Sequence, residues 1–147
     1  MTIRKSGNAH WEGDLKTGTG HLSTQSGALT EQPYGFNTRF EGKAGTNPEE
    51  LVGAAHASCF AMALSMILGE EGITPEAIDA KATVTLAEKD GGFAVTASHL
   101  DVTIKAEGAQ EATVLNCAEA AKENCPISKL LEAEITMDAK ARVRGHS

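Results

Sequence analysis

Short stretches in which apolar and polar residues alternate fill the first third of the chain. Residues 1–45 are also rich in Gly, Ser, Thr and Asn, which predicts an extended region that forms hairpins. Within it, AHWEGD and GHLSTQSG are expected to pair as strands. YGFNTRFE alternates as well, which predicts a further strand with its aromatic residues on one face and Arg39 beside Glu41 on the other.

A long apolar pattern follows and predicts one helix. Asn47 can cap its first turn, Pro48 suits the first helical position, and the two glutamates that follow favour the positive end of the helix dipole. Helical character continues to Gly69, which gives a rod about 30 Å long. Residues 51–68 are uncharged, at the lower edge of membrane-spanning length. Their polar members, acidic flanks and lack of basic anchors favour a buried helix over a membrane span.

The rest of the chain alternates between strand and helix patterns. DAKATVTLAEKD is typical of a strand, KDGG of a turn, and GFAVTASHLDVTIKAEG of a returning strand. In the returning strand the apolar positions shift by one residue, which predicts a bulge near Ser98. AQEATVLNCAEAAKEN predicts an amphipathic helix that ends before Pro126, followed by a short helix in CPISKLL and a last strand in EITMDAKARV.

These elements predict an α+β fold with an antiparallel sheet packed on a long, buried central helix. The helix is apolar nearly all round and needs cover on every side, whereas the sheet can cover one flank. A second subunit would cover the remainder, so we expect a tight homodimer. The pattern contains no repeat, low-complexity tract or linker, so residues 1–147 are expected to form a single domain.

Charge and cysteine content narrow the possible functions. The net charge of −7, with no cluster of Lys or Arg, argues against nucleic acid and anionic membrane surfaces as partners. The N-terminus lacks the apolar run of a signal peptide, so a cytoplasmic location with reduced thiols is expected. Three cysteines without a CxxC pair fit neither a disulfide scaffold nor a zinc ribbon.

Cys59 lies in the middle of the predicted central helix, and two interpretations remain open. A free cysteine is among the most buried residue types and packs like a small hydrophobe. A reactive Cys59 would need another side chain to activate it, because the helix dipole acts only near the N-terminus. A nearby arginine would lower the thiol pKa by about 1 to 3 units. His56, one turn earlier, could also polarise the thiol, although a neutral histidine in a packed helix is more often structural.

Cys125 has a different setting, because it precedes Pro126 where a short helix begins. It would face free backbone N–H groups, which stabilise a thiolate, or it could be an incidental cysteine in a capped turn. Two cysteines far apart in sequence, one buried and one at a helix start, suit an attacking and a resolving thiol. Cys117 lies within a polar helix and is interpreted as structural.

Three separate blocks of the sequence resemble one known family. NPEELVGAAHASCFAMAL closely resembles the helix motif of the OsmC/Ohr family, the osmotically inducible and organic-hydroperoxide-resistance proteins. QPYGFNTRFEG and CPISKLLEAEITMDA resemble its other two blocks. The resemblance runs in the right order over nearly the whole chain and is closer to the OsmC branch than to Ohr.

The resemblance implies a cysteine-based peroxidase for stress defence, which reduces organic hydroperoxides better than hydrogen peroxide and needs no metal, haem or flavin. Matched by motif, Cys59 is the peroxidatic thiol that becomes a sulfenic acid, and Cys125 is the resolving thiol that forms a disulfide with it. Arg39 is the activating cation, and Glu49 orients Arg39. The implied assembly is an intertwined α+β homodimer with active sites at the subunit interface.

The resemblance also sets expectations about partners. The reductant would be a dithiol, such as a lipoyl protein, thioredoxin or a small thiol. Phe36, Phe40, Met62 and Met66 could line an apolar pocket for alkyl or lipid hydroperoxides, or could be plain core. Glu49 and Cys59 lie ten residues apart, about 15 Å along one helix and out of phase. We therefore predict that Glu49, with Arg39, comes from the partner subunit.

Other interpretations of these residues remain open. Spacing alone favours an ion pair between Arg39 and Glu41. A metal-binding module could use His56 and Cys59, one helical turn apart, with Cys125 and another histidine. A non-catalytic stress or ligand-binding dimer would need no reactive thiol. A Cys-His hydrolase is weaker, because no strained elbow and no orienting third residue are apparent.

Overall fold

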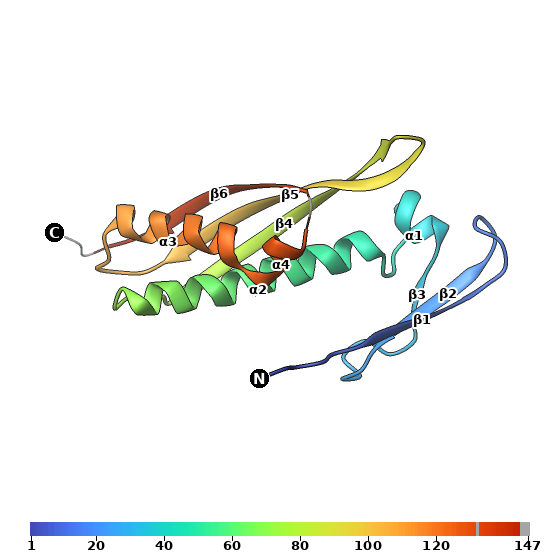
Figure 1. The fold of residues 1–147 in the computed structure, drawn as a ribbon, viewed down its shortest axis with the longest axis horizontal. Helices are drawn as coiled ribbons and strands as arrows, with labels where there is room; N and C mark the ends of the chain where they lie inside the picture. The colour runs from blue at the N-terminus through green and yellow to red at the C-terminus, as the bar shows by residue number, and fades with distance from the viewer. Residues whose placement is uncertain (132, 145–147) are drawn as a thin grey trace. The chain divides into compact units, whose positions relative to one another are not determined.

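The computed structural model describes residues 1–131 and 133–144 of the chain (Figure 1). The chain divides into two compact units, Met1–Leu51 and Val52–Ser147. The first unit contains β1 (Gly7–Glu12), β2 (Thr19–Thr24), β3 (Gln32–Tyr34) and the short helix α1 (Phe36–Phe40), and the long helix α2 (Pro48–Glu70) begins in it. The second unit adds β4 (Ala77–Lys89), β5 (Gly92–Lys105), α3 (Glu111–Asn124), α4 (Pro126–Leu130) and β6 (Glu134–Arg142).

The first unit is built on an antiparallel sheet in the order β1-β2-β3. Ala9 of β1 pairs with Leu22 of β2, which confirms the pairing of the first two predicted strands. The rings of Trp11 and Tyr34 lie over Gly20, where an added Cβ would be 2.6 Å from the Trp11 ring and 2.8 Å from the Tyr34 ring. A glycine therefore allows two aromatic side chains to cover this part of the sheet.

The strand predicted in YGFNTRFE is wrong, because residues Phe36–Phe40 form the helix α1. The Thr38 hydroxyl donates to the Gly35 carbonyl and accepts from the Gly35 N–H, at 3.0 and 2.9 Å, which closes a helical turn. The rings of Phe36 and Phe40 then meet with their centroids 4.9 Å apart. Residues four apart share a face in a helix as well as in a strand, so the aromatic spacing fits both periods.

The long helix α2 begins where its sequence predicts. The Asn47 side-chain oxygen accepts from the Glu50 N–H at 2.8 Å, which satisfies one of the free donors of the first turn. By length and composition α2 could cross a membrane. In the second unit it is instead the core helix, with one stripe fully buried: Gly53, His56, Phe60, Leu64 and Leu68. The opposite face is open within the unit, since Met62 and Met66 are 77% and 62% exposed.

The second unit packs α2 and α3 on one face of the sheet β4-β5-β6 (Figure 1). The core joins Phe60 and Leu64 of α2, Leu100 and Ile104 of β5, and Val114 of α3. α2 comes close to β4 at Gly53, where an added Cβ would lie 3.1 Å from the Ala82 carbonyl oxygen. The predicted alternation of the last strand is confirmed, because its apolar side chains pack against this core: Ile135, Met137, Ala139, Ala141 and Val143.

The expected antiparallel sheet holds for β4 and β5 but not for β6, which pairs with β5 in parallel. The two helices α3 and α4 carry the chain back along the sheet, so β6 starts near the bulge of β5 and runs in the same direction. A mixed sheet therefore replaces the wholly antiparallel one, within an α+β fold as predicted.

The predicted bulge in the returning strand is confirmed and lies two residues before Ser98. Thr85 pairs with Ala97 and Leu86 pairs with Val95, so Thr96 has no partner in the ladder. One extra residue reverses which side chains face the core. Ser98 therefore points inward and has no exposed surface.

Candidate active site

The first unit brings Arg39 and Glu49 together. The guanidinium donates through Nε to one carboxylate oxygen of Glu49 at 3.0 Å and through Nη2 to the other at 2.9 Å. Two parallel bonds fix the guanidinium plane as well as its position. Spacing alone favours a pair with Glu41, but the helical turn of α1 directs Arg39 to Glu49 in the first turn of α2.

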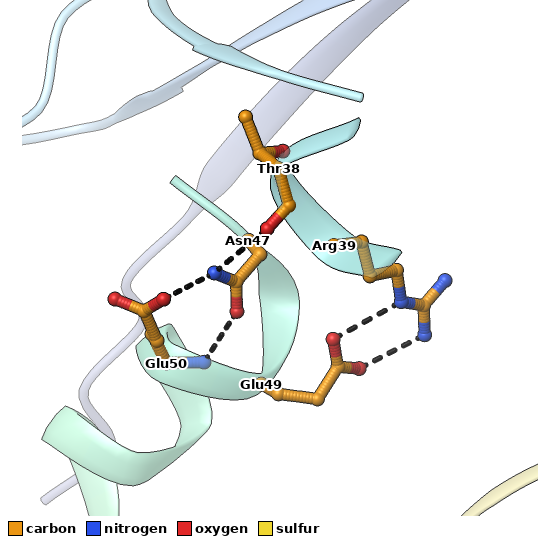
Figure 2. A network of polar contacts seen from close by, with 5 residues as sticks. All are labelled: Thr38, Arg39, Asn47, Glu49 and Glu50. Carbon is orange, nitrogen blue, oxygen red and sulfur yellow. Dashed lines mark hydrogen bonds and ion pairs between the residues drawn. The ribbon is translucent and has the colours of Figure 1, made fainter. Parts of the chain in front are cut away.

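A second set of contacts supports this pair (Figure 2). The Asn47 amide donates to the Thr38 carbonyl at 3.5 Å and to the Glu50 carboxylate, and so joins α1 to the start of α2. Both Asn47 and Thr38 are buried. Gly45, with φ of 147°, approaches Thr38 so closely that an added Cβ would lie 2.8 Å from its methyl carbon. The backbone that carries Arg39 is therefore held by polar contacts rather than by an apolar core.

The second unit brings the two candidate thiols together. Cys59 on α2 is half-buried and packs against the core, while Cys125, which precedes α4, is completely buried, and both are free thiols. The start of α4 serves both sulfurs. The Ser128 N–H donates to Cys125 Sγ at 3.3 Å, and the Ile127 N–H hydrogen-bonds Cys59. The predicted role of this helix start in facing Cys125 is confirmed.

The environment of Cys59 opposes ionisation within its own unit. Burial raises the pKa of the Cys59 thiol, the Ile127 N–H lowers it in part, and the neighbouring Cys125 thiol raises it again. None of these influences, which come from described residues, is a cation. A reactive Cys59 therefore needs a positive charge brought to it, as its mid-helix position predicted.

His56 does not serve Cys59 but forms a buried chain of hydrogen bonds. Its Nδ1 lies 2.7 Å from the Ser98 hydroxyl and its Nε2 lies 2.9 Å from the Ser128 hydroxyl. The Ser128 hydroxyl lies in turn 3.1 Å from Cys125 Sγ. Burial lowers the pKa of His56, so the ring is neutral at neutral pH.

The remaining predicted residues fall into separate places. Phe36 and Phe40 contact each other in the first unit. Met62 and Met66 lie one turn apart on the exposed face of α2 in the second, so the four-residue substrate pocket stays a prediction. Cys117 is buried in the core, as its structural interpretation expects.

The metal-binding alternative gains no support from the geometry, because serine hydroxyls engage both ring nitrogens of His56. Possible metal ligands gather elsewhere, where His99, Asp101 and Asp138 bring one ligand atom each within 4.8 Å of one another. Both carboxylates are exposed. His99 contacts Asp138 at 2.8 Å and Asp101 at 3.5 Å, which is a surface ion-pair arrangement without a thiol.

Sequence reasoning missed the two serines of the buried chain. The position of Ser128 could have been predicted from its spacing to Cys125. A residue three positions after a helix cap lies in the first turn of the helix, where it contacts the side chain of the cap. Ser98 carried no signal of its own, because its inward direction depends on the bulge at Thr96.

Comparison with known proteins identifies the family of this chain. The sequence profile described as OsmC-like protein matches residues 40–140. The chain is 56% identical to the peroxiredoxin OsmC of Escherichia coli K12 over 94% of this chain and 96% of that protein. It is 33% identical to the organic hydroperoxide resistance protein OhrB of Bacillus subtilis over 79% of this chain and 84% of that protein.

Solved structures share the fold. The crystal structure of OhrB of Bacillus subtilis superposes with a TM-score of 0.66 at 24% identity, over 92% of this chain and 97% of that one. An OsmC-like protein of unknown function from Vibrio cholerae superposes with a TM-score of 0.73 at 17% identity, over 94% of this chain and 99% of that one. The resemblance seen in the sequence blocks is confirmed: the chain belongs to the OsmC family of OsmC-like proteins.

Proposed function

We propose that this protein is a thiol-dependent peroxidase that reduces organic hydroperoxides to alcohols, and hydrogen peroxide less well. Cys59 is the attacking thiol and Cys125 the resolving thiol. The observation that carries the proposal is the meeting of two free thiols from distant parts of the sequence at the start of α4. Relatives named peroxiredoxin OsmC and organic hydroperoxide resistance protein support the same chemistry.

The cycle needs no group beyond the chain and its substrates. The Cys59 thiolate attacks the distal peroxide oxygen, the O–O bond breaks, and the alkoxide takes a proton and leaves as alcohol. Cys59 is then a sulfenic acid, and Cys125 condenses with it to form a disulfide and water. A dithiol, such as a lipoyl protein, thioredoxin or a small thiol, reduces the disulfide in the cytoplasm. No metal, haem or flavin takes part.

Arg39 supplies the positive charge in this proposal, and Glu49 orients it. The need for a cation follows from the buried setting of Cys59, which raises its pKa. Glu49 and Cys59 are ten residues apart on α2, a rise of about 15 Å. We therefore assign Arg39 and Glu49 of one subunit to the Cys59 of a second, in a homodimer whose contact includes the exposed face of α2.

The proposed activity is tested by mixing the reduced protein with an alkyl hydroperoxide or hydrogen peroxide in a stopped-flow instrument. We expect fast consumption of the alkyl hydroperoxide and a Cys59–Cys125 disulfide in the mass spectrum. Cys59→Ser should abolish consumption. Cys117→Ser, which alters the third cysteine of the chain, should leave it unchanged. Peroxide consumption by Cys59→Ser at the wild-type rate would remove the proposal. Alkylation of Cys59 no faster than a model thiol would favour a non-catalytic dimer.

The shared site is tested by complementation. The Arg39→Ala protein is expected to be strongly slowed and the Cys59→Ser protein inactive, because every site in the first dimer lacks the cation and every site in the second lacks the attacking thiol. Mixed under conditions that exchange subunits, they should regain activity, since a heterodimer contains one site with both groups. Mixtures that stay inactive although heterodimers form would place Arg39 and Cys59 of the same subunit in one site.

A further inference from the structure

A continuous chain of polar side chains crosses the apolar core of the second unit. It runs from Ser98 on β5 through His56 on α2 to Ser128 on α4, and it ends on the sulfur of Cys125. Ser98, His56 and Cys125 have no exposed surface, and Ser128 is 7% exposed. Burying polar groups is costly, and apolar residues of similar shape would pack this space at least as well. Buried polar side chains that are hydrogen-bonded to one another and end on a thiol indicate a role in the chemistry of that thiol.

We propose that His56, acting through Ser128, is the base that takes the proton of Cys125 when Cys125 condenses with oxidised Cys59. The inference rests on the function proposed above and adds a positioning residue to its second step. Both hydrogen bonds of the His56 ring go to serine hydroxyls, so its influence on Cys125 passes through Ser128.

One orientation of these hydrogen bonds makes His56 an acceptor from Ser128. With its proton on Nδ1, His56 donates to the Ser98 hydroxyl and leaves Nε2 as an acceptor. Ser128 then donates to Nε2, and its oxygen accepts from the Cys125 thiol. In this orientation Ser98 accepts the hydrogen bond from Nδ1 and leaves Nε2 as the basic nitrogen. It can do so because the bulge at Thr96 turns its side chain inward.

The step balances as follows. The Cys125 thiol proton passes to Ser128 while the Ser128 hydroxyl proton passes to Nε2 of His56. The Cys125 thiolate attacks the sulfenic sulfur of Cys59, the S–S bond forms and the S–O bond breaks. The leaving hydroxide takes up a proton, His56 releases the one it accepted, and the hydroxide departs as water. Cys125 sulfur is oxidised, Cys59 sulfur is reduced by the same amount, and the relay returns to its starting state.

The contacts after proton transfer are also favourable. Protonated His56 donates to Ser128, and the Ser128 hydroxyl donates the proton it received back toward the thiolate. The Ser128 N–H, 3.3 Å from Cys125 Sγ, donates to the same sulfur. The thiolate therefore receives two hydrogen bonds from one residue, and this stabilises the attacking form.

The deciding variant is His56→Gln, measured in single turnover. The Gln amide can still donate to one serine and accept from the other, but it cannot take a proton. We expect formation of the Cys59 sulfenic acid at the wild-type rate and disulfide formation slowed about a hundredfold, the usual size of a general-base effect. A purely structural role predicts two wild-type rates for this variant, provided that its thermal unfolding confirms a folded protein.

Three further variants make the test specific. Ser128→Ala should slow disulfide formation as His56→Gln does, while Ser128→Thr, which keeps the hydroxyl, should restore it. His99→Gln changes a histidine of the same unit that takes no part in the hydrogen bonds between Ser98 and Cys125, and it should leave both steps unchanged.

The inference and the proposed function fail in distinguishable ways. Wild-type disulfide formation in His56→Gln, or equal slowing of both steps, would overturn the relay and leave the peroxidase intact. If wild-type Cys59 formed no sulfenic acid with any hydroperoxide, the proposed function would fail first.

Discussion

The two units of the chain differ in what holds them together and in the chemistry they carry. Within Met1–Leu51, where every residue is described, the buried side chains are polar, Thr38 and Asn47, and hydrogen bonds fix the turn that bears Arg39. The unit Val52–Ser147 holds the buried apolar core and both candidate thiols. A guanidinium keeps much of its hydration at a partly exposed position, whereas a sulfur nucleophile benefits from a site with little water.

Neither unit by itself is sufficient for the proposed chemistry. The thiol unit raises the pKa of its own nucleophile by burial, and the arginine unit contains a fixed cation without a nucleophile. In the proposed function, reactivity arises when Arg39 meets Cys59 of another subunit. Regulation of assembly would then regulate reactivity, because a separated chain would keep Cys59 largely protonated at neutral pH.

The largest expected effect comes from removing the cation. Arg39→Ala should lower the rate of Cys59 oxidation at pH 7 by about tenfold to a thousandfold, since an adjacent cation lowers a pKa by about 1 to 3 units. The rate follows the thiolate fraction, so the rising limb of the pH–rate profile should move to higher pH by the same amount. Stopped-flow rates between pH 6 and pH 10 measure both effects.

The matched control is Lys43→Ala, which removes another cation of the first unit. It should change neither the rate at pH 7 nor the profile. An unshifted profile in Arg39→Ala would show that another group stabilises the Cys59 thiolate. The two units would then not divide the cation and the thiol between them.

The second expected effect concerns stability. Leu64→Ala removes a side chain with no exposed surface and should destabilise the second unit by about 2 to 5 kcal/mol. Leu22→Ala, at a half-buried position of β2, should cost roughly 1 kcal/mol or less, because less surface returns to water. Hydrogen exchange of backbone amides measures each unit by itself. Equal losses would mean that the first unit gains an apolar core on assembly.

The start of α2 was predictable from sequence because its signals are local. Asn47, Pro48 and the glutamates act through contacts within one turn, and the structure has the cap where they place it. The helix α1 was missed for the opposite reason. Its aromatic residues satisfy two periods at once, and Thr38 decides between them by bonding Gly35.

Tertiary arrangement accounts for the other differences. The direction of β6 depends on how α3 and α4 cross the sheet, which no pattern within β6 records. The site shows the same limit. The family blocks predict both cysteines and the Arg39–Glu49 pair as site residues. The buried hydrogen bonds of His56 could not be predicted in this way, because they require three elements to meet.

A smaller effect is expected from the cap of α2. Asn47→Ala removes the bond to the Glu50 N–H and the contact with the Thr38 carbonyl, and should cost about 1 kcal/mol. It should also loosen the backbone that carries Arg39 and so reduce the peroxidase rate a few-fold. Asn47→Asp keeps the capping oxygen but sets a second carboxylate beside that of Glu50, so it should recover only part of the stability. An Asn47→Asp protein as slow as Asn47→Ala would assign the rate effect to the amide contacts with the Thr38 carbonyl and the Glu50 carboxylate.

The smallest effect is the dependence of stability on His56 ionisation. Burial lowers the pKa of His56 in the folded chain below its ordinary value of 6.5, so above that pH the ring is neutral in both states. As the pH falls through 6.5, the unfolded chain takes up a proton that the folded chain does not, and the free energy of unfolding decreases by at most about 1.4 kcal/mol per pH unit. His56→Gln lacks this term, so its deficit in stability against wild type should shrink between pH 7.5 and pH 5.5. Urea unfolding of both proteins measures the difference, in which the other histidines cancel. Parallel curves would mean that His56 ionises equally in both states, which contradicts the burial of its ring between two serine hydroxyls.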